Sequence, residues 1–199
     1  MTPVETRNER LAQKMIKNLE RRHFEACYCK TSEEAVKKVL ELIPEGSSIT
    51  WGGSATIRET GITKALHEGN YIVMDRDEAP DREAAQEIYR KAFCCDYYLS
   101  SANAISEDGV IVNIDGNGNR VAAITFGPKK VIFVIGMNKV AQDVQSALAR
   151  ARSTASPINA ARFDIKTPCQ ADGMCHNCNS AECSCKYIHL MRNFNPAGR

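Results

Sequence analysis

Five of the chain's nine cysteines lie in one short segment near its C-terminal end. Cys175 and Cys178 have the Cys-x-x-Cys spacing that brings two thiolates to one metal centre, with Cys169 upstream and Cys183 or Cys185 downstream. Four thiolates suit tetrahedral zinc or an iron–sulfur cluster. The segment is polar and contains glycine, so it has no apolar reason to fold without a ligand. We therefore expect these four cysteines to hold a metal.

The spacing alone leaves the identity of that metal open between zinc and iron–sulfur. The pattern C-x5-C-x2-C-x6-C matches neither a paired-knuckle zinc ribbon nor a bacterial ferredoxin motif. Cys183 is a substitute for Cys185, and His176 is an alternative ligand. Free thiols or redox disulfides in a tail are the alternative to a metal site.

A second candidate site is a glycine loop that follows the expected strand 48–51. Two glycines let the backbone turn sharply and present N–H groups, and the following hydroxyls and helix N-terminus favour an anion. The loop is neither a dinucleotide-binding nor a Walker motif, and a plain glycine turn before a capped helix is the alternative. The candidate ligand-binding residues are Gly52, Gly53, Ser54 and Thr56.

Two further loops follow expected strands, where open α/β sheets bind their ligands. The loop 101–108 offers Asn103 as a ligand-binding residue, and Glu107 and Asp108 as catalytic acids or bases. The loop 136–139 offers Asn138 and Lys139 to an anionic ligand. An ordinary surface loop and an ordinary helix start are the respective alternatives.

Strands and helices alternate along the chain, which predicts an α/β fold. We expect a mostly parallel sheet with helices on both faces, an antiparallel hairpin and a cysteine-rich C-terminal segment. The hairpin joins strands 110–114 and 121–126 through the turn Asp115–Asn119. The division is 1–166 for the α/β domain and 167–199 for the metal-binding segment. The other expected strands are 48–51, 71–74, 97–100 and 131–135, and expected helices begin near residues 1, 31, 56, 81, 138 and 159, with a break at 153–157.

Composition narrows the classes of function. The hydrophobic share is 43%, the charged share 25% and the formal net charge +2, so nothing favours a nucleic-acid or membrane-surface role. The first 20 residues predict an amphipathic helix rather than a targeting segment, and we expect a cytoplasmic protein. The histidines are in no recognisable catalytic motif, and His67 is expected on a helix surface.

Several motifs distributed along the chain are familiar in combination. They are Trp51–Thr56, Ser101–Ile105, Asp108–Gly109, Asn113–Val121, Gly127–Pro128, Gly136–Val140, Ala149–Arg152, Pro157–Ala160 and Thr167–Cys169. Together they resemble the lactate-utilization (LUD) domain family over nearly the whole chain. The cysteine tail resembles that of a separate branch of the family, with Cys183 as an extra cysteine.

The resemblance implies a fold like that of ribose-5-phosphate isomerase and the CoA transferases. It also implies an association with the oxidation of lactate to pyruvate, alongside iron–sulfur oxidoreductase subunits as partners. The leading hypothesis is an accessory or redox component of organic-acid utilization that binds a small anionic metabolite. A homodimer is a possible assembly. The alternatives are a self-sufficient isomerase, hydrolase or transferase acting on a phosphorylated or CoA-linked metabolite, and a non-enzymatic binding module.

Overall fold

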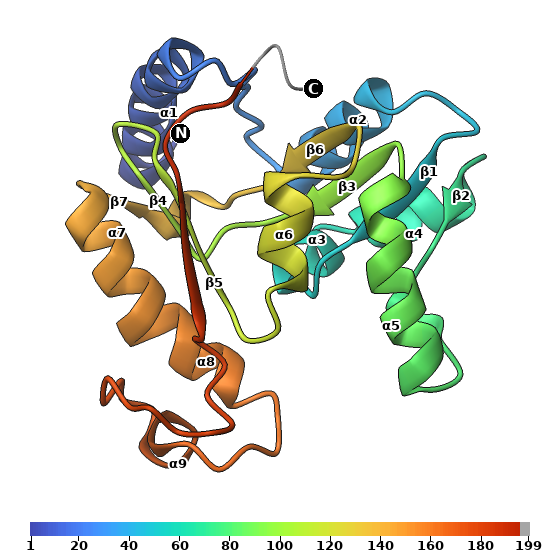
Figure 1. Ribbon diagram of the computed structural model, residues 1–199. Coiled ribbons are helices and arrows are strands. Elements are labelled where there is room, and N and C mark those ends of the chain that lie inside the picture. The colour runs from blue at the N-terminus through green and yellow to red at the C-terminus, as the bar shows by residue number, and fades with distance from the viewer. Residues whose placement is uncertain (196–199) are drawn as a thin grey trace. The chain divides into compact units, whose positions relative to one another are not determined.

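The computed structural model describes residues 1–195 and confirms the α/β fold class. The chain forms two four-stranded sheets that belong to two compact units (Figure 1). Unit 1 contains Met1–Tyr28, Ala102–Val121 and the described residues from 136 onward, and unit 2 contains Cys29–Ser101 and Ala122–Ile135. Among the described residues, no helix is long and apolar enough to span a bilayer. Residues 196–199 of the predicted cysteine segment lie outside the described residues.

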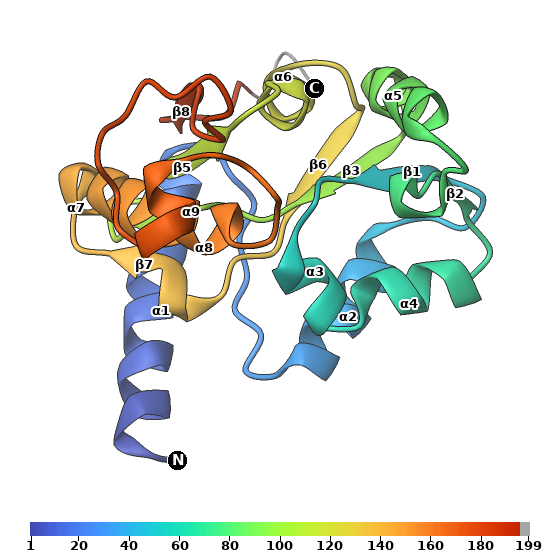
Figure 2. The ribbon, with the colours of Figure 1, turned by 90° about the horizontal axis from the view of Figure 1, so that it is seen from below.

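Unit 2 is built on sheet A, whose strands are all parallel. Its order is β2 (Ile72–Val73), β1 (Ser48–Trp51), β3 (Tyr97–Ser100) and β6 (Lys130–Phe133). Helices α2, α3 and α4 lie on one face and α5 on the other (Figure 2). These helices are α2 (Ser32–Leu42), α3 (Ala55–Glu59), α4 (Ile62–Glu68) and α5 (Arg82–Lys91), with short 3-10 turns η1 (Arg76–Glu78) and η2 (Ala92–Cys94).

Side-chain caps and an apolar core fix the elements of unit 2. Thr31, Ser54 and Asp81 each accept a hydrogen bond from a backbone N–H in the first turn of α2, α3 and α5. Helix α3 begins at Ala55, close to the expected start near residue 56, and its cap is Ser54 rather than Thr56. The core residues are Val39, Ile43, Ile49, Trp51, Ile57, Ile62, Leu66 and Leu99.

Unit 1 is built on sheet B, which is mixed. Its order is β7 (Val140–Ala141), β4 (Ala104–Ser106), β5 (Ile111–Asp115) and β8 (Tyr187–Met191), and only β4 and β7 pair in parallel. The fully buried Ala147 and Ala151 pack against residues of β4 and β5. The helical segments are α1 (Pro3–Arg21), η3 (Met137–Lys139), α7 (Val144–Arg150), η4 (Ala151–Ala155), α8 (Ser156–Ala160) and α9 (Pro168–Asp172).

The expected hairpin between 110–114 and 121–126 is wrong. Residues Asn119–Thr125 form helix α6, and the antiparallel partner of β5 in a hairpin is β4. The Asp115 carboxylate accepts hydrogen bonds from the N–H groups of Asn117, Gly118, Arg120 and Val121, at 3.0–3.1 Å. A carboxylate that satisfies so many donors at a helix start outweighs the strand preference of the following β-branched residues.

Two expectations for residues 138–157 are also wrong. Asn138 caps no long helix, because Val140 and Ala141 pair with β4 as β7, and Asp143 is the cap of α7. The expected break at 153–157 does not occur. The chain instead continues from α7 through the π-helical segment η4 into α8, with Pro157 near the α8 start, where its missing N–H costs little.

Candidate functional site

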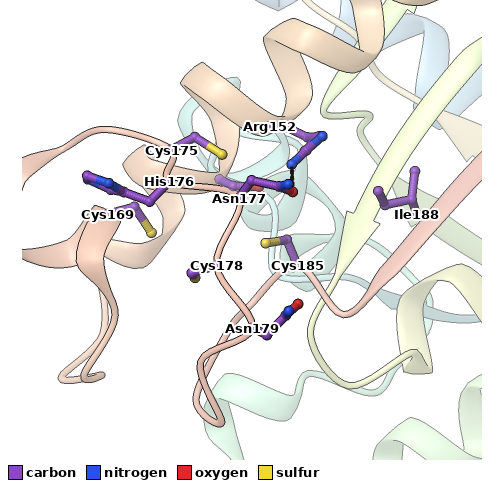
Figure 3. A pocket seen from close by; sticks show the side chains of 10 residues that line it. Arg152, Cys169, Cys175, His176, Asn177, Cys178, Asn179, Cys185 and Ile188 are labelled. Carbon is purple, nitrogen blue, oxygen red and sulfur yellow. Dashed lines mark hydrogen bonds between the residues drawn. The ribbon is translucent and has the colours of Figure 1, made fainter.

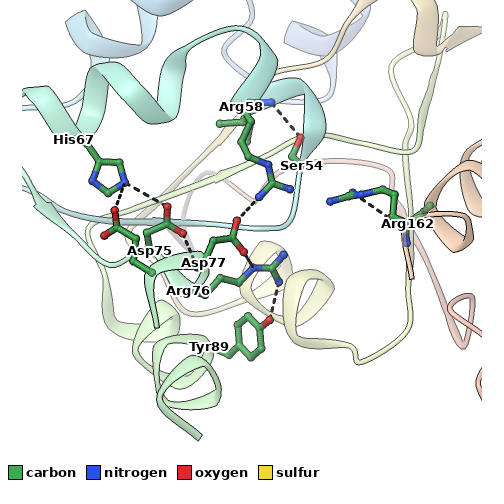
Figure 4. A network of polar contacts seen from close by, with 11 residues as sticks. Ser54, Arg58, His67, Asp75, Arg76, Asp77, Tyr89 and Arg162 are labelled. Atoms are coloured by element: carbon green, nitrogen blue, oxygen red, sulfur yellow. Dashed lines mark hydrogen bonds and ion pairs between the residues drawn. The ribbon is translucent and has the colours of Figure 1, made fainter. Parts of the chain in front are cut away.

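The glycine loop follows β1 at the carboxyl end of sheet A, as expected, and an arginine lies against it (Figure 4). Gly52 N–H donates to the Leu99 carbonyl at 3.1 Å, and Ser54 N–H donates to the Gly52 carbonyl at 2.7 Å, which closes a tight turn. The Ser54 hydroxyl caps α3 by accepting from Ile57 N–H at 3.3 Å. In the described part of the chain, Gly53 N–H has no acceptor. Gly53 therefore offers an uncommitted backbone donor in this loop.

The guanidinium of Arg76 is fixed beside this loop. Its Nη1 donates to the Tyr89 hydroxyl at 2.7 Å, and its central carbon lies 5.4 Å from the Tyr89 ring centroid. Its Nε lies 3.4 Å from an Asp77 carboxylate oxygen. A Cβ at Gly53 would collide with Nη2, so the glycine permits the close approach. Nη2 has no acceptor among residues 1–195 and remains a donor for an anion.

Arg58 and Asp77 complete the charges around the loop. Arg58, in α3, forms an ion pair with Asp77, which also faces Arg76 (Figure 4). Two guanidiniums therefore share one carboxylate, so these three side chains together carry a net positive charge. Thr56 lies in the first turn of α3. Sequence reasoning missed Arg76 and Tyr89. The position of Arg76, just after the strand expected at 71–74, is the signal that could have identified it.

The polar candidates of unit 1 meet at Arg150. Its guanidinium donates to the Asn103 carbonyl and, at 3.2 Å, to the Asn138 carbonyl, and Lys139 follows Asn138 in η3. Burial lowers the pKa of Arg150. The structure thus brings Asn103, Asn138 and Lys139 into one region of unit 1, and their role in binding a ligand stays a prediction.

The side chain of Asn103 belongs to a network that the sequence did not predict. Its Oδ1 accepts from Ile114 N–H at 2.8 Å and from Arg120 Nη2 at 2.9 Å. Arg120 Nη1 also donates to Oδ1 of the fully buried Asn113 at 2.7 Å. Among the described residues, Asn113 Nδ2 has no acceptor. A buried amide donor of this kind is available to a water molecule or a ligand group.

The proposed acid/base residues lie at the other end of β4 from Asn103. The three residues of β4 separate Asn103 from Glu107, and four steps along extended chain correspond to roughly 13 Å. Asp108 pairs with Arg22 at 2.5 Å and accepts from the Ser106 hydroxyl at 2.5 Å. Asp108 thus has a structural contact that explains its presence. The structure does not bring Glu107 or Asp108 together with Asn103, and their catalytic role stays a prediction.

The four predicted cysteine ligands line a single cavity of about 200 Å³ in unit 1 (Figure 3). They come from α9 and from the loop that leads into β8. Arg152, in η4, also lines this cavity and donates to the Asn177 side chain. The remaining lining residues are Ser156, His176, Asn179 and Ile188, together with Cys169, Cys175, Cys178 and Cys185.

The sulfur atoms are not gathered around one point. In residues 1–195, no three cysteine sulfurs lie within 4.8 Å of one another, whereas tetrahedral zinc places its sulfurs about 3.8 Å apart. The fifth cysteine, Cys183, is buried, and its Sγ lies 3.0 Å from that of Cys185. Hydrogen bonds from Ser180 lower the pKa of Cys178, whereas burial raises the pKa of Cys185 to about 12.

Comparison with known proteins identifies one family. The family model of the LUD domain matches residues 12–192. Among solved structures, the chain is similar to a DUF162 family protein from Deinococcus radiodurans, with a TM-score of 0.45 and 15% sequence identity over 73% of this chain and 79% of that chain. No curated protein sequence matches the chain.

Proposed function

Because the chain belongs to the LUD domain family, we propose that it is an accessory or redox component of organic-acid utilization. The family suggests a role in lactate utilization. The proposal has two parts, which are a metal centre held by the cysteines of unit 1 and a small anionic ligand bound at the glycine loop of unit 2. The convergence of four cysteines on one cavity is the observation that carries it.

The cavity fits an iron–sulfur cluster better than a single zinc ion. Each thiolate of a [4Fe–4S] cluster binds a different iron atom, so the sulfurs need not converge on one point. Among the described residues no three cysteine sulfurs lie within 4.8 Å of one another, which agrees with this requirement. Cys169, Cys175, Cys178 and Cys185 would hold the cluster, and the Arg152 guanidinium would offset part of their negative charge. When bound, such a cluster supplies one-electron transfer.

The glycine loop supports binding of a carboxylate or phosphate group. Gly53 N–H and Arg76 Nη2 are two donors without an acceptor in the described chain, and they lie side by side. Charge-assisted hydrogen bonds from arginine to carboxylates or phosphates are about twice as strong as neutral ones. The positive local charge of Arg58, Arg76 and Asp77 favours an anion over a neutral ligand.

The metal part is tested by purifying the protein anaerobically and analysing it for iron, zinc and acid-labile sulfide. We expect iron and sulfide, with a broad visible absorbance that dithionite bleaches. Cys178→Ser should abolish that absorbance, whereas Cys27→Ser, at an exposed cysteine that does not line the cavity, should leave it unchanged. A colourless protein that contains zinc would show that the cysteines hold a structural zinc ion and not a cluster. A folded protein without any metal would refute the metal centre.

Thermal unfolding with lactate, pyruvate or inorganic phosphate tests the anion part. A ligand present at 100 times its Kd stabilises the folded state by about 2.7 kcal/mol. Arg76→Ala should abolish the shift in Tm, whereas Arg90→Ala, at an exposed arginine paired with Glu87, should retain it. If the two variants respond equally, the ligand does not bind at the glycine loop.

A further inference from the structure

We infer that His67, Asp75 and Glu78 form a second metal site, suited to a divalent transition ion such as zinc, cobalt or manganese. One atom from each of the three side chains lies within 4.8 Å of the other two. The site lies in unit 2, and every ligand comes from outside the cysteine segment. This inference does not depend on the proposed function.

The spacing of the three atoms matches the coordination sphere of one small ion. His67 Nε2 lies 3.3 Å from Asp75 Oδ2 and 3.8 Å from Glu78 Oε1. With metal–ligand distances of about 2.1 Å, neighbouring ligands of a tetrahedral ion lie about 3.4 Å apart. An ion can therefore sit among the three atoms after only small side-chain rotations.

Rigid elements hold two of the ligands in place. Asp75 Oδ1 accepts from Asp77 N–H at 2.9 Å as the cap of η1, which leaves Oδ2 directed at His67 (Figure 4). The His67 ring packs edge-on against Trp51, with centroids 5.6 Å apart and an interplanar angle of 81°. Trp51 is a core residue and only 4% exposed. Ligands positioned in advance lose little side-chain entropy when they bind an ion.

The chemistry of the donors also favours a transition ion over calcium or magnesium. One imidazole nitrogen and two carboxylates are a ligand set of the kind that zinc, cobalt and manganese accept, and the two carboxylates neutralise a divalent charge. Glu78 is mostly exposed, with 70% of its side chain accessible, so an ion has an entry path and water can fill the remaining positions. A simple ion pair of protonated His67 with the two acids is the competing explanation.

The site shares η1 with the glycine-loop arginine. Asp75 and Glu78 flank Arg76 and Asp77, and these two residues carry the charges beside Gly53. An ion bound to Asp75 and Glu78 would tie both ends of this short turn to α4. The consequence is a more rigid placement of Arg76.

Cobalt titration of the full-length chain tests the site, because Trp51 is the only tryptophan and lies next to His67. Co²⁺ quenches tryptophan fluorescence at short range, so quenching of Trp51 reports on an ion bound at His67. Cobalt bound to the cysteines is recognised separately, by its thiolate charge-transfer absorbance. We expect saturable quenching that zinc reverses. Glu78→Gln keeps the His67–Trp51 contact and should weaken the apparent Kd at least about tenfold.

Glu68→Gln is the matched control, since Glu68 neighbours His67 in the chain but lies outside the three-residue site. Its cobalt affinity should stay within about twofold of the unaltered chain. Absence of saturable quenching would overturn the inference in favour of the ion pair. Equal quenching in Glu78→Gln and in the unaltered chain would overturn it as well, because Glu78 would then not be a ligand.

Discussion

The contact between Gly53 and Arg76 leads to a prediction about the free energy of unfolding of unit 2. Gly53→Ala introduces a Cβ where the Arg76 guanidinium lies, so the arginine must move away. Displacement disrupts its hydrogen bond to Tyr89, at 2.7 Å, and its stacking on the Tyr89 ring. A hydrogen bond from a charged donor contributes about 1.5–3 kcal/mol, and an exposed cation–π contact about 0.5–1 kcal/mol.

Two effects reduce the loss. The arginine keeps part of its contacts after a small shift, and replacing glycine by alanine stabilises the folded state by about 0.4–1 kcal/mol through the unfolded chain. Gly53 has no left-handed backbone angle that alanine would strain. We expect a net loss of about 1–2 kcal/mol, which corresponds to a decrease in Tm of about 2–8 °C.

A double-mutant cycle isolates the contact. In an Arg76→Ala background, the added methyl meets no guanidinium, so Gly53→Ala should be neutral or slightly stabilising. The coupling energy between the two substitutions should therefore be about 1–3 kcal/mol. Urea unfolding followed by the fluorescence of Trp51 reports on unit 2. Additive effects of the two substitutions would refute the reasoning.

Three further predictions concern single residues. Burial raises the pKa of Cys95 to about 11, which leaves about 0.1% of this thiol as thiolate at pH 8. Iodoacetamide should therefore label Cys95 at least about a hundredfold more slowly than an ordinary thiol until the chain unfolds. Equal labelling of Cys95 and the exposed Cys94 by peptide mass spectrometry would contradict this. Hydrogen bonds from Lys129 and Ser48 lower the pKa of Asp96. The ionised Asp96 therefore stabilises the fold above about pH 4, and this contribution is lost as the pH falls toward the folded-state pKa. Asp96→Asn should lower the urea midpoint by more at pH 7 than at pH 3. An equal decrease of the midpoint at both pH values would argue against the contacts. Asp115→Ala removes the acceptor of four backbone N–H groups at the start of α6 and should cost about 2 kcal/mol in a thermal or urea unfolding experiment, whereas a change under about 0.5 kcal/mol would show that solvent satisfies those donors.

Local sequence patterns predicted most elements of sheet A. Strands 48–51 and 97–100 have the expected bounds, and the helix starts after Thr31 and Asp81 follow from side-chain caps. The error at 121–126 arose because Asp115 belongs to both a turn pattern and a helix cap, and the pattern alone does not distinguish them. Strand β8 was not predicted, because its pairing with β5 joins distant segments.

The candidate sites also divide into those whose residues are close in sequence and those whose residues are distant. The glycine loop and the four cysteines were predicted because each is contiguous or nearly so in sequence. Arg76 follows the loop by more than 20 residues, and Tyr89 lies 13 residues beyond Arg76. His67, Asp75 and Glu78 lack the regular spacing of a metal motif, since α4 supplies one and the chain after β2 supplies the other two. Only the placement of α4 next to η1 in the folded chain brings them together.

The pairing of β5 with β8 sets an order for folding during synthesis. All four strands of sheet A are made by residue 133, whereas β8 emerges roughly 70 residues after its partner β5. At 5–20 residues per second, one edge of β5 waits for about 4–14 s and is exposed to wrong partners during that time. The cysteines at 169–185 leave the ribosome just before β8, and Ile188 of β8 also lines their cavity, so the cavity is complete only when β8 has been made. The metal centre proposed above would then help to hold β8 against β5, so a shortage of metal during growth should reduce the yield of folded protein.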